Sequence, residues 1–200
     1  MVAFLPGGTR TVATENAAEK TEKPKSDRPA NETATARAPA EAKAVKPLVI
    51  ERLTHEDVGD IVNLFRKVWD PYLVGLPPEV QRAWQPTPLE FTSGMEGVTY
   101  FSAKRDQKLI GVVGCAIHAG SCHLLNLAVD VEHRRHGIGT ALLAAATGWA
   151  QHAQTRSLYV EVLARFQDAM ALLAASGFTK AGTLHRHFWG EDVELFEKTL

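Results

Sequence analysis

The pattern of apolar and polar positions divides residues 47–200 into strands and helices. The segment from Leu48 to Leu53 predicts a first strand, and apolar residues at helical spacing from Val58 to Trp69 predict a helix behind it. Thr54 and Asp57 are spaced as a capping box at the start of that helix, which Asp70-Pro71 ends. Residues 77–94, punctuated by two prolines, predict a second and shorter helical region.

The remaining two thirds of this region predict strands first and then alternating helices and strands. Three hairpins are expected, turning at residues 105–107, at 118–121 and near Gly190–Asp192. Periodicity alone predicts an α/β fold with an antiparallel first half. The expected elements are strands at 98–104, 108–118 and 122–129, a helix at about 137–154, a strand at 158–162, a helix ending at 176 and a hairpin over 178–200.

Residues 1–46 have a different composition from the rest of the chain. From about Gly7 to Lys46 they are Ala, Thr, Glu, Lys and Pro with almost no large apolar residue, so they cannot bury enough surface to offset their ordering entropy. We therefore predict a disordered N-terminal tail, 1–46, before one domain, 47–200. Acidic residues argue against a transit peptide, Met1–Leu5 is too short for a signal sequence, and no run reaches membrane-spanning length. We expect a soluble cytoplasmic protein without a membrane partner.

Charge and cysteine content exclude several classes of function. The chain has 22 Lys and Arg against 23 Asp and Glu, so no basic field predicts nucleic-acid binding. Cys115 and Cys122 match no metal or redox spacing, and buried free thiols are expected. The histidine pairs at 133/136 and 185/187 also lack a ligand-like arrangement, and no metal site is predicted.

The segment from Leu124 to Leu143 predicts a strand, a basic turn with glycines and the start of a helix. A helix N-terminus leaves backbone N–H groups unpaired and carries about half a positive charge, so it attracts phosphate. Arg134, Arg135 and His136 add side-chain charge, and Gly137 and Gly139 let a ligand approach the backbone. A phosphorylated ligand is expected here.

Two common phosphate motifs do not fit this segment. A P-loop requires Lys before Ser or Thr, whereas Gly139 is followed directly by Thr140. The dinucleotide fingerprint is half matched, because Leu142 stands where close packing requires Gly or Ala. The long turn 130–136 is also unlike the tight turn of that fold.

A third motif does fit. Arg134-x-x-Gly137-x-Gly139, following Leu127-Ala128-Val129, resembles the Q/R-x-x-G-x-G/A acyl-CoA signature of the GNAT N-acetyltransferase superfamily. The later helix, strand, helix and Gly177-Phe178 fall in the family's order, and the resemblance covers about residues 48–200. It implies a mixed, largely antiparallel α/β sheet of six to seven strands, with helices on both faces and a splayed parallel strand pair.

The resemblance also implies a coenzyme and the residues that bind it. Acetyl-CoA would be a co-substrate, with its pantetheine arm between the splayed strands and its pyrophosphate at the helix start. The implied cofactor-binding residues are Leu127, Ala128, Val129, Arg134, Arg135, His136, Gly137, Ile138, Gly139 and Thr140.

Catalysis is less completely specified. Glu161 occupies the position that supplies a base in the family's N-terminal-amine acetyltransferases, while a solvent-facing or ion-paired strand Glu is the alternative. The family often has Asn and Tyr where this chain has Phe166 and Leu173, neither of which can donate a proton. The general acid is unassigned. Substitutes are Tyr159, Ser176, His185, His187 or water.

The function implied is acetyl-CoA-dependent N-acetyl transfer, directly to a primary amine of a small molecule or protein. The alternative is an acyl-CoA-binding regulatory module without turnover. Acceptor identity is expected to depend on residues 70–97 and 185–192. Family members often dimerise through sheet edges, so a homodimer is one option.

Overall fold

A computed structural model describes residues 46–200 of the 200-residue chain. The tail predicted for residues 1–46 therefore lies outside the described residues, except for Lys46. The described residues form strands and helices in the order expected from the sequence, with short helices at several boundaries.

Seven strands form one mixed sheet in the order β1-β2-β3-β4-β5-β7-β6. Every neighbouring pair is antiparallel except β4 and β5, which are parallel. This confirms the predicted fold class. The strands are β1 (Val49–Arg52), β2 (Val98–Arg105), β3 (Lys108–His118), β4 (Ser121–Val129), β5 (Ser157–Leu163), β6 (Thr179–Phe188) and β7 (Glu191–Thr199).

Five α-helices connect these strands. The single helical region expected at 77–94 is instead two helices, because Pro88 begins a new helix that Thr87 caps through the N–H of Glu90. The helices are α1 (Val58–Trp69), α2 (Pro78–Trp84), α3 (Pro88–Ser93), α4 (Ile138–His152) and α5 (Gln167–Ala175), with 3₁₀ turns η1 (His55–Asp57), η2 (Asp70–Tyr72) and η3 (Val131–His133).

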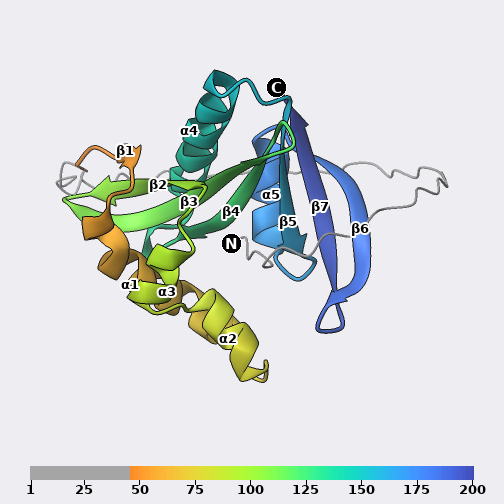
Figure 1. The fold of residues 1–200 in the computed structure, drawn as a ribbon, viewed down its shortest axis with the longest axis horizontal. Coiled ribbons are helices and arrows are strands. Elements are labelled where there is room, and N and C mark those ends of the chain that lie inside the picture. Colours follow the sequence, from red (N-terminus) through yellow and green to blue (C-terminus); the bar gives the residue numbers. More distant parts are fainter. Residues whose placement is uncertain (1–45) are drawn as a thin grey trace, which may run out of the picture. The chain divides into compact units, whose positions relative to one another are not determined.

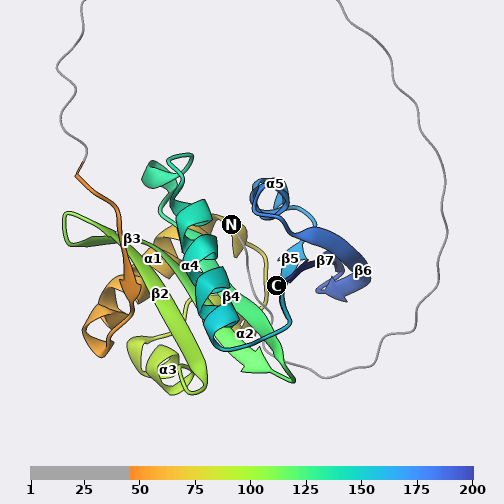
Figure 2. The same cartoon turned by 90° about the horizontal axis from the view of Figure 1, so that it is seen from above.

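Helices cover both faces of the sheet, with α4 on one side of β2–β4 and α1 and α3 on the other (Figure 1). Gly111 of β3 lets α4 approach closely, since a Cβ there would stand 3.0 Å from Leu142 Cδ1 and 3.1 Å from Ile138 Cγ2. On the opposite face the ring of Tyr100 lies 5.1 Å from that of Phe91 in α3. The view from above shows α4 crossing β2–β4 and α5 close to β5 (Figure 2).

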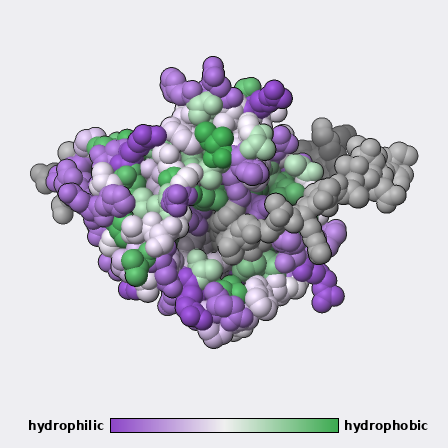
Figure 3. Space-filling model, viewed as in Figure 1, coloured by the Kyte–Doolittle hydropathy of each residue, from purple (hydrophilic) through white to green (hydrophobic). Residues whose placement is uncertain are grey.

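The apolar core lies between these layers. Each of the three layers, α1, the sheet and α4, contributes large, fully buried side chains. Examples are Phe65 of α1, Ile110 of β3 and Leu142 of α4. Hydrophobic residues on the face in Figure 3 form small separate patches among polar ones. Cys115 and Cys122 are both buried free thiols, as predicted. Among the described residues no helix is long and apolar enough to cross a membrane.

The parallel pair β4–β5 is joined over only three residue pairs, from Ser121↔Ser157 to His123↔Tyr159. Beyond that point β4 continues to Val129 and β5 to Leu163 without pairing with each other, and the two strands diverge (Figure 1). Asn126, at φ 50°, marks a bulge where the β3–β4 register also shifts. The splayed pair that the sequence resemblance implied is present.

Candidate functional site

A cavity of about 430 Å³ opens beside the part of β4 that does not pair with β5. Its wall comes from β4, from the loop before α4, from the first turn of α4 and from α5. The lining residues are Leu127, Val129, His133, Arg134, Arg135, Gly137, Ile138, Gly139, Thr140, Asp168, Ala171, Leu172 and Ala175.

The N-terminus of α4 provides an anion-binding end to this cavity. Gly137 is the N-cap residue with φ 76°, a left-handed conformation that favours glycine, and no side chain caps the helix. The N–H of Ala141 bonds the carbonyl of Gly137, so the three preceding N–H groups have no partner of the usual i−4 kind. Those groups belong to Ile138, Gly139 and Thr140, which all line the cavity.

Two arginines lie in the loop before this helix. The Nε of Arg134 donates to the carbonyl of Val129 at 3.3 Å, which fixes the side chain against the end of β4. Arg135 is exposed and has φ 63°, so this loop holds two left-handed residues, Arg135 and Gly137, within three positions. A positive loop that opens onto free N–H groups suits phosphate.

Eight of the ten residues predicted to bind the coenzyme line the cavity. Ala128 does not, because side chains alternate along β4 and its methyl group is buried opposite Val112. His136 does not line the cavity either. Its ring is exposed, and its Nδ1 lies 2.7 Å from the carbonyl oxygen of Arg134.

The contribution of α5 was not anticipated from the sequence. A Cβ on Gly139 would stand 2.7 Å from Leu172 Cδ2, so this glycine admits α5 as well as a ligand. The glycine at position 139 was a usable signal for that close approach, but the sequence does not say which helix approaches. The unanticipated lining residues are His133, Asp168, Ala171, Leu172 and Ala175.

Glu161 lies on β5 opposite Leu195 of β7 and on the same sheet face as Tyr159. Its side chain is half-buried and forms no hydrogen bond or salt bridge with another described residue. Burial raises the pKa of Glu161, an effect that the charge of His187 opposes. A raised pKa makes this carboxylate a stronger base than an exposed one.

The two departures from the family pattern are structural residues. Leu173 is fully buried in α5. Phe166 packs against Tyr72 at 5.1 Å and against Trp69 and Trp84 at about 6.5 Å. Hydrophobic packing therefore explains both positions, and neither offers a proton.

Tyr159 is the candidate acid closest in sequence to Glu161 on the same face. Burial raises the pKa of Tyr159, with a further contribution from the charge of Glu161, so the phenol is protonated at neutral pH. Its ring stacks on His123 at 4.2 Å, and burial lowers the pKa of His123 to about 3. His185 instead pairs with Asp192 at 3.2 Å on the exposed hairpin.

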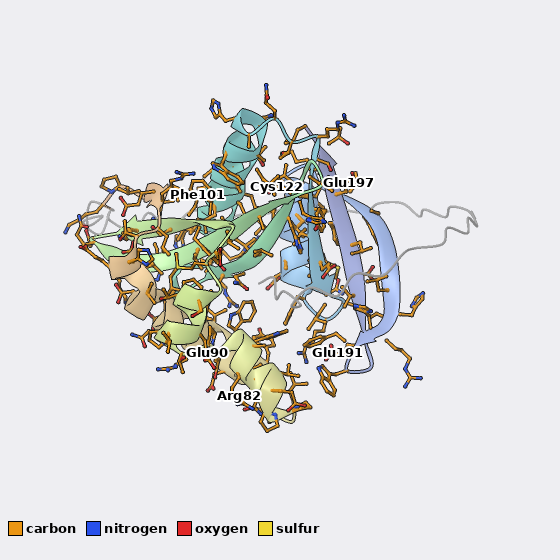
Figure 4. The ribbon with its side chains drawn as sticks, in the orientation of Figure 1. Arg82, Glu90, Phe101, Cys122, Glu191 and Glu197 are labelled. Carbon is orange, nitrogen blue, oxygen red and sulfur yellow. The ribbon has the colours of Figure 1, made fainter. Side chains whose placement is uncertain are left out.

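Arg165 joins three segments on the side of the sheet where acceptor specificity was expected. Its Nη1 lies 3.1 Å from Oε1 of Glu191, and its Nη2 donates to the carbonyl of Tyr72 at 3.5 Å. Figure 4 shows Glu191 at the β6–β7 turn and Arg82 on α2. The η2 turn, the β5–α5 loop and the β6–β7 hairpin are therefore in contact.

The sequence matches the model of the Acetyltransferase (GNAT) family over residues 61–178. It is 28% identical to human N-acetyltransferase 8B and 29% identical to human N-acetyltransferase 8, each over 105 residues. Those segments are 50% of this chain and 46% of each relative, so the match spans about half the length of either protein.

Solved structures share the fold at low sequence identity. The ribosomal-protein-S18-alanine N-acetyltransferase of Escherichia coli has a TM-score of 0.63 at 21% identity, covering 76% of this chain and 94% of its own. The PaiA N-acetyltransferase of Thermoplasma acidophilum, solved with coenzyme A, has a TM-score of 0.65 at 18% identity, covering 77% and 99%.

Proposed function

The chain belongs to the GNAT acetyltransferase family, and we propose that it transfers an acetyl group from acetyl-CoA to a primary amine of a small molecule or protein. We assign this activity to residues 47–200. The observation that carries the proposal is the cavity at the splayed β4–β5 pair, which contains the uncapped N-terminus of α4 and the two arginines before it.

The chemistry of the cavity fits coenzyme A. The first-turn N–H groups of α4, with Arg134 and Arg135, would bind the pyrophosphate. Leu127 and Val129 lie on the part of β4 that pairs with β3 but not with β5, and backbone groups on the edge facing β5 can bond an amide-containing arm. One such N–H can also polarise a thioester carbonyl, as an oxyanion-hole donor does.

Transfer requires the amine to lose a proton as its nitrogen bonds the acetyl carbon and the carbon–sulfur bond breaks. We assign proton acceptance to Glu161, because its raised pKa makes it a better base than an exposed carboxylate. Tyr159 is the candidate that can return a proton to the departing sulfur, and water is the alternative.

A second function is supported by a separate observation. Phe166 and Leu173 are buried where many family members have polar residues, so part of the usual catalytic set is absent. A regulatory module that binds acyl-CoA without turnover would need the cavity but not Glu161.

Calorimetry with acetyl-CoA, followed by thiol release with a panel of primary amines, distinguishes the two functions. We expect binding with turnover, and we expect Glu161→Gln to retain binding while losing at least about a hundredfold in rate. Binding without turnover on any amine would favour the regulatory module. Absence of binding would refute both.

A further inference from the structure

The loop that forms the phosphate end of the cavity is attached at its start to α1. Asp130 directly follows β4, and its carboxylate is only 3% exposed. The ammonium Nζ of Lys67, 63 residues earlier, lies 2.8 Å from Oδ1 and 3.0 Å from Oδ2 of Asp130. The same Nζ lies 3.1 Å from Oε2 of Glu132. One lysine of α1 therefore contacts two residues at the beginning of the loop.

Asp130 also organises the backbone around it. Its Oδ1 accepts the N–H of Glu132 at 3.1 Å, and its carbonyl accepts the N–H of His133 at 2.9 Å. Its own N–H donates to the carbonyl of Ile110 on β3 at 2.9 Å. Asp130 thus ties the turn that precedes Arg134 to both the sheet and α1.

The cation that neutralises the carboxylates of Asp130 and Glu132 is the side chain of Lys67. Asp130, Glu132 and His133 bring potential ligand atoms within 4.8 Å of one another, as a metal site would. The ammonium of Lys67, however, already contacts both carboxylates. Burial would raise the pKa of Asp130, but the hydrogen bond from Lys67 and that from the Glu132 N–H lower it overall, so the pair is ionised at neutral pH.

The loop beyond this anchor needs support because its conformation is unfavourable in a free chain. Arg135 and Gly137 both have left-handed backbone angles, and Arg135 has a Cβ that disfavours that region. When only a fraction of molecules holds the binding conformation, the apparent Kd for the ligand equals the intrinsic Kd divided by that fraction.

We propose that Lys67 and Asp130 are positioning residues for the coenzyme: their ion pair holds the 131–137 loop so that its arginines and the α4 N-terminus meet the pyrophosphate together. The inference rests on the proposed function. His133 lies beside both the ion pair and the cavity, since it lines the cavity while its Nδ1 lies 3.6 Å from Oδ2 of Asp130.

Lys104 provides a matched control. Its Nζ also lies between two carboxylates, 2.8 Å from Glu51 and 2.6 Å from Asp57, but none of these residues lines the cavity. Lys67→Met and Lys104→Met each remove one lysine from such a cluster. We expect both to lower the melting temperature, whereas only Lys67→Met lowers the affinity for CoA, by about three- to tenfold. Lys67→Arg should retain most of the affinity for CoA that Lys67→Met loses.

Asp130→Asn separates positioning from simple electrostatics. Removing a negative charge beside a phosphate site strengthens anion binding by Coulomb's law, whereas loss of the anchor weakens it. We expect weaker CoA binding in both Lys67→Met and Asp130→Asn, and a double variant little worse than either alone.

Calorimetry with CoA on the full chain gives outcomes that can be told apart. If the unaltered protein does not bind CoA, the proposed function fails and this inference fails with it. If it binds, and Lys67→Met binds equally well or Asp130→Asn binds more tightly, only the positioning role is refuted. Should Asp130→Asn fail to fold, Lys67→Met is compared with the unaltered protein at rising ionic strength. A loss of CoA affinity that salt removes reflects the missing charge and refutes positioning, whereas a loss that persists supports it.

Discussion

Gly137 offers a quantitative test of the cavity because its conformational and ligand-binding roles can be separated. It has φ 76°, and a Cβ built on it meets no atom within 4 Å. Gly137→Ala therefore adds no clash, and its cost in folding free energy is the left-handed backbone alone, about 1–2 kcal/mol. For a domain of this size that corresponds to a melting temperature lower by about 2–8 °C.

Gly120, in the β3–β4 turn, is the matched control. It has φ 82°, its added Cβ also meets nothing within 4 Å, and it does not line the cavity. Gly120→Ala should therefore destabilise the protein by a similar amount. Only the methyl group at 137 stands where a phosphate would approach the helix N–H groups, so only Gly137→Ala should weaken CoA binding.

The expected loss of affinity follows from one charge-assisted hydrogen bond. Such bonds contribute about 1.5–3 kcal/mol, which corresponds to roughly a 10- to 150-fold rise in Kd. Thermal unfolding and calorimetry on the same samples measure both effects. Equal CoA affinity in Gly137→Ala and Gly120→Ala would refute the assignment of this helix end to the phosphate, whatever happened to the melting temperatures.

Three further changes test other parts of the protein. Glu161→Gln should raise the melting temperature above pH 7, because burial raises the pKa of Glu161 and penalises only its ionised form. This gain should disappear as the pH falls toward 4.5, where the carboxyl group is protonated; a difference in melting temperature that does not depend on pH would contradict the reasoning. The double change Arg134→Ala with Arg135→Ala should raise the Kd for CoA about tenfold or more and flatten its dependence on salt, measured by calorimetry at several ionic strengths; an unaltered salt dependence would argue against a charge contact. Gly114→Ala should cost about 1–3 kcal/mol in chemical denaturation, because its Cβ would stand 2.7 Å from Tyr100 Cε1; an unchanged midpoint would show that the ring can move.

The sequence predicted the elements that carry strong local signals. Apolar spacing defined α1 to its last residue, Trp69, and Asp70-Pro71 marked the point where the α-helix gives way to the 3₁₀ turn η2. The division between α2 and α3 was missed, since a proline can interrupt a helix or begin one, and Pro88 begins one.

The candidate site was predicted as far as it is local in the chain. Gly137 and Gly139 marked the helix start, and Leu127 and Val129 alternate on the strand before it. Contacts between distant segments were not accessible in this way. Leu172 reaches the cavity only because α5 packs beside Gly139, and Lys67 meets Asp130 across 63 residues. Gly139 signals a close approach without indicating which helix makes it, and the contact between Lys67 and Asp130 leaves no periodic or compositional trace.

The short contact between β4 and β5 lies beside the proposed coenzyme site, so a coenzyme bound there would add to the stability of the fold. Three residue pairs join strands β1–β4 to strands β5–β7, and the opening beside that contact is the proposed coenzyme site. A coenzyme bound there favours the folded chain, by about 2.7 kcal/mol at a hundred times its Kd. In a cell where unfolded chains are degraded, the amount of enzyme would then rise and fall with the concentration of the coenzyme, without any change in its synthesis.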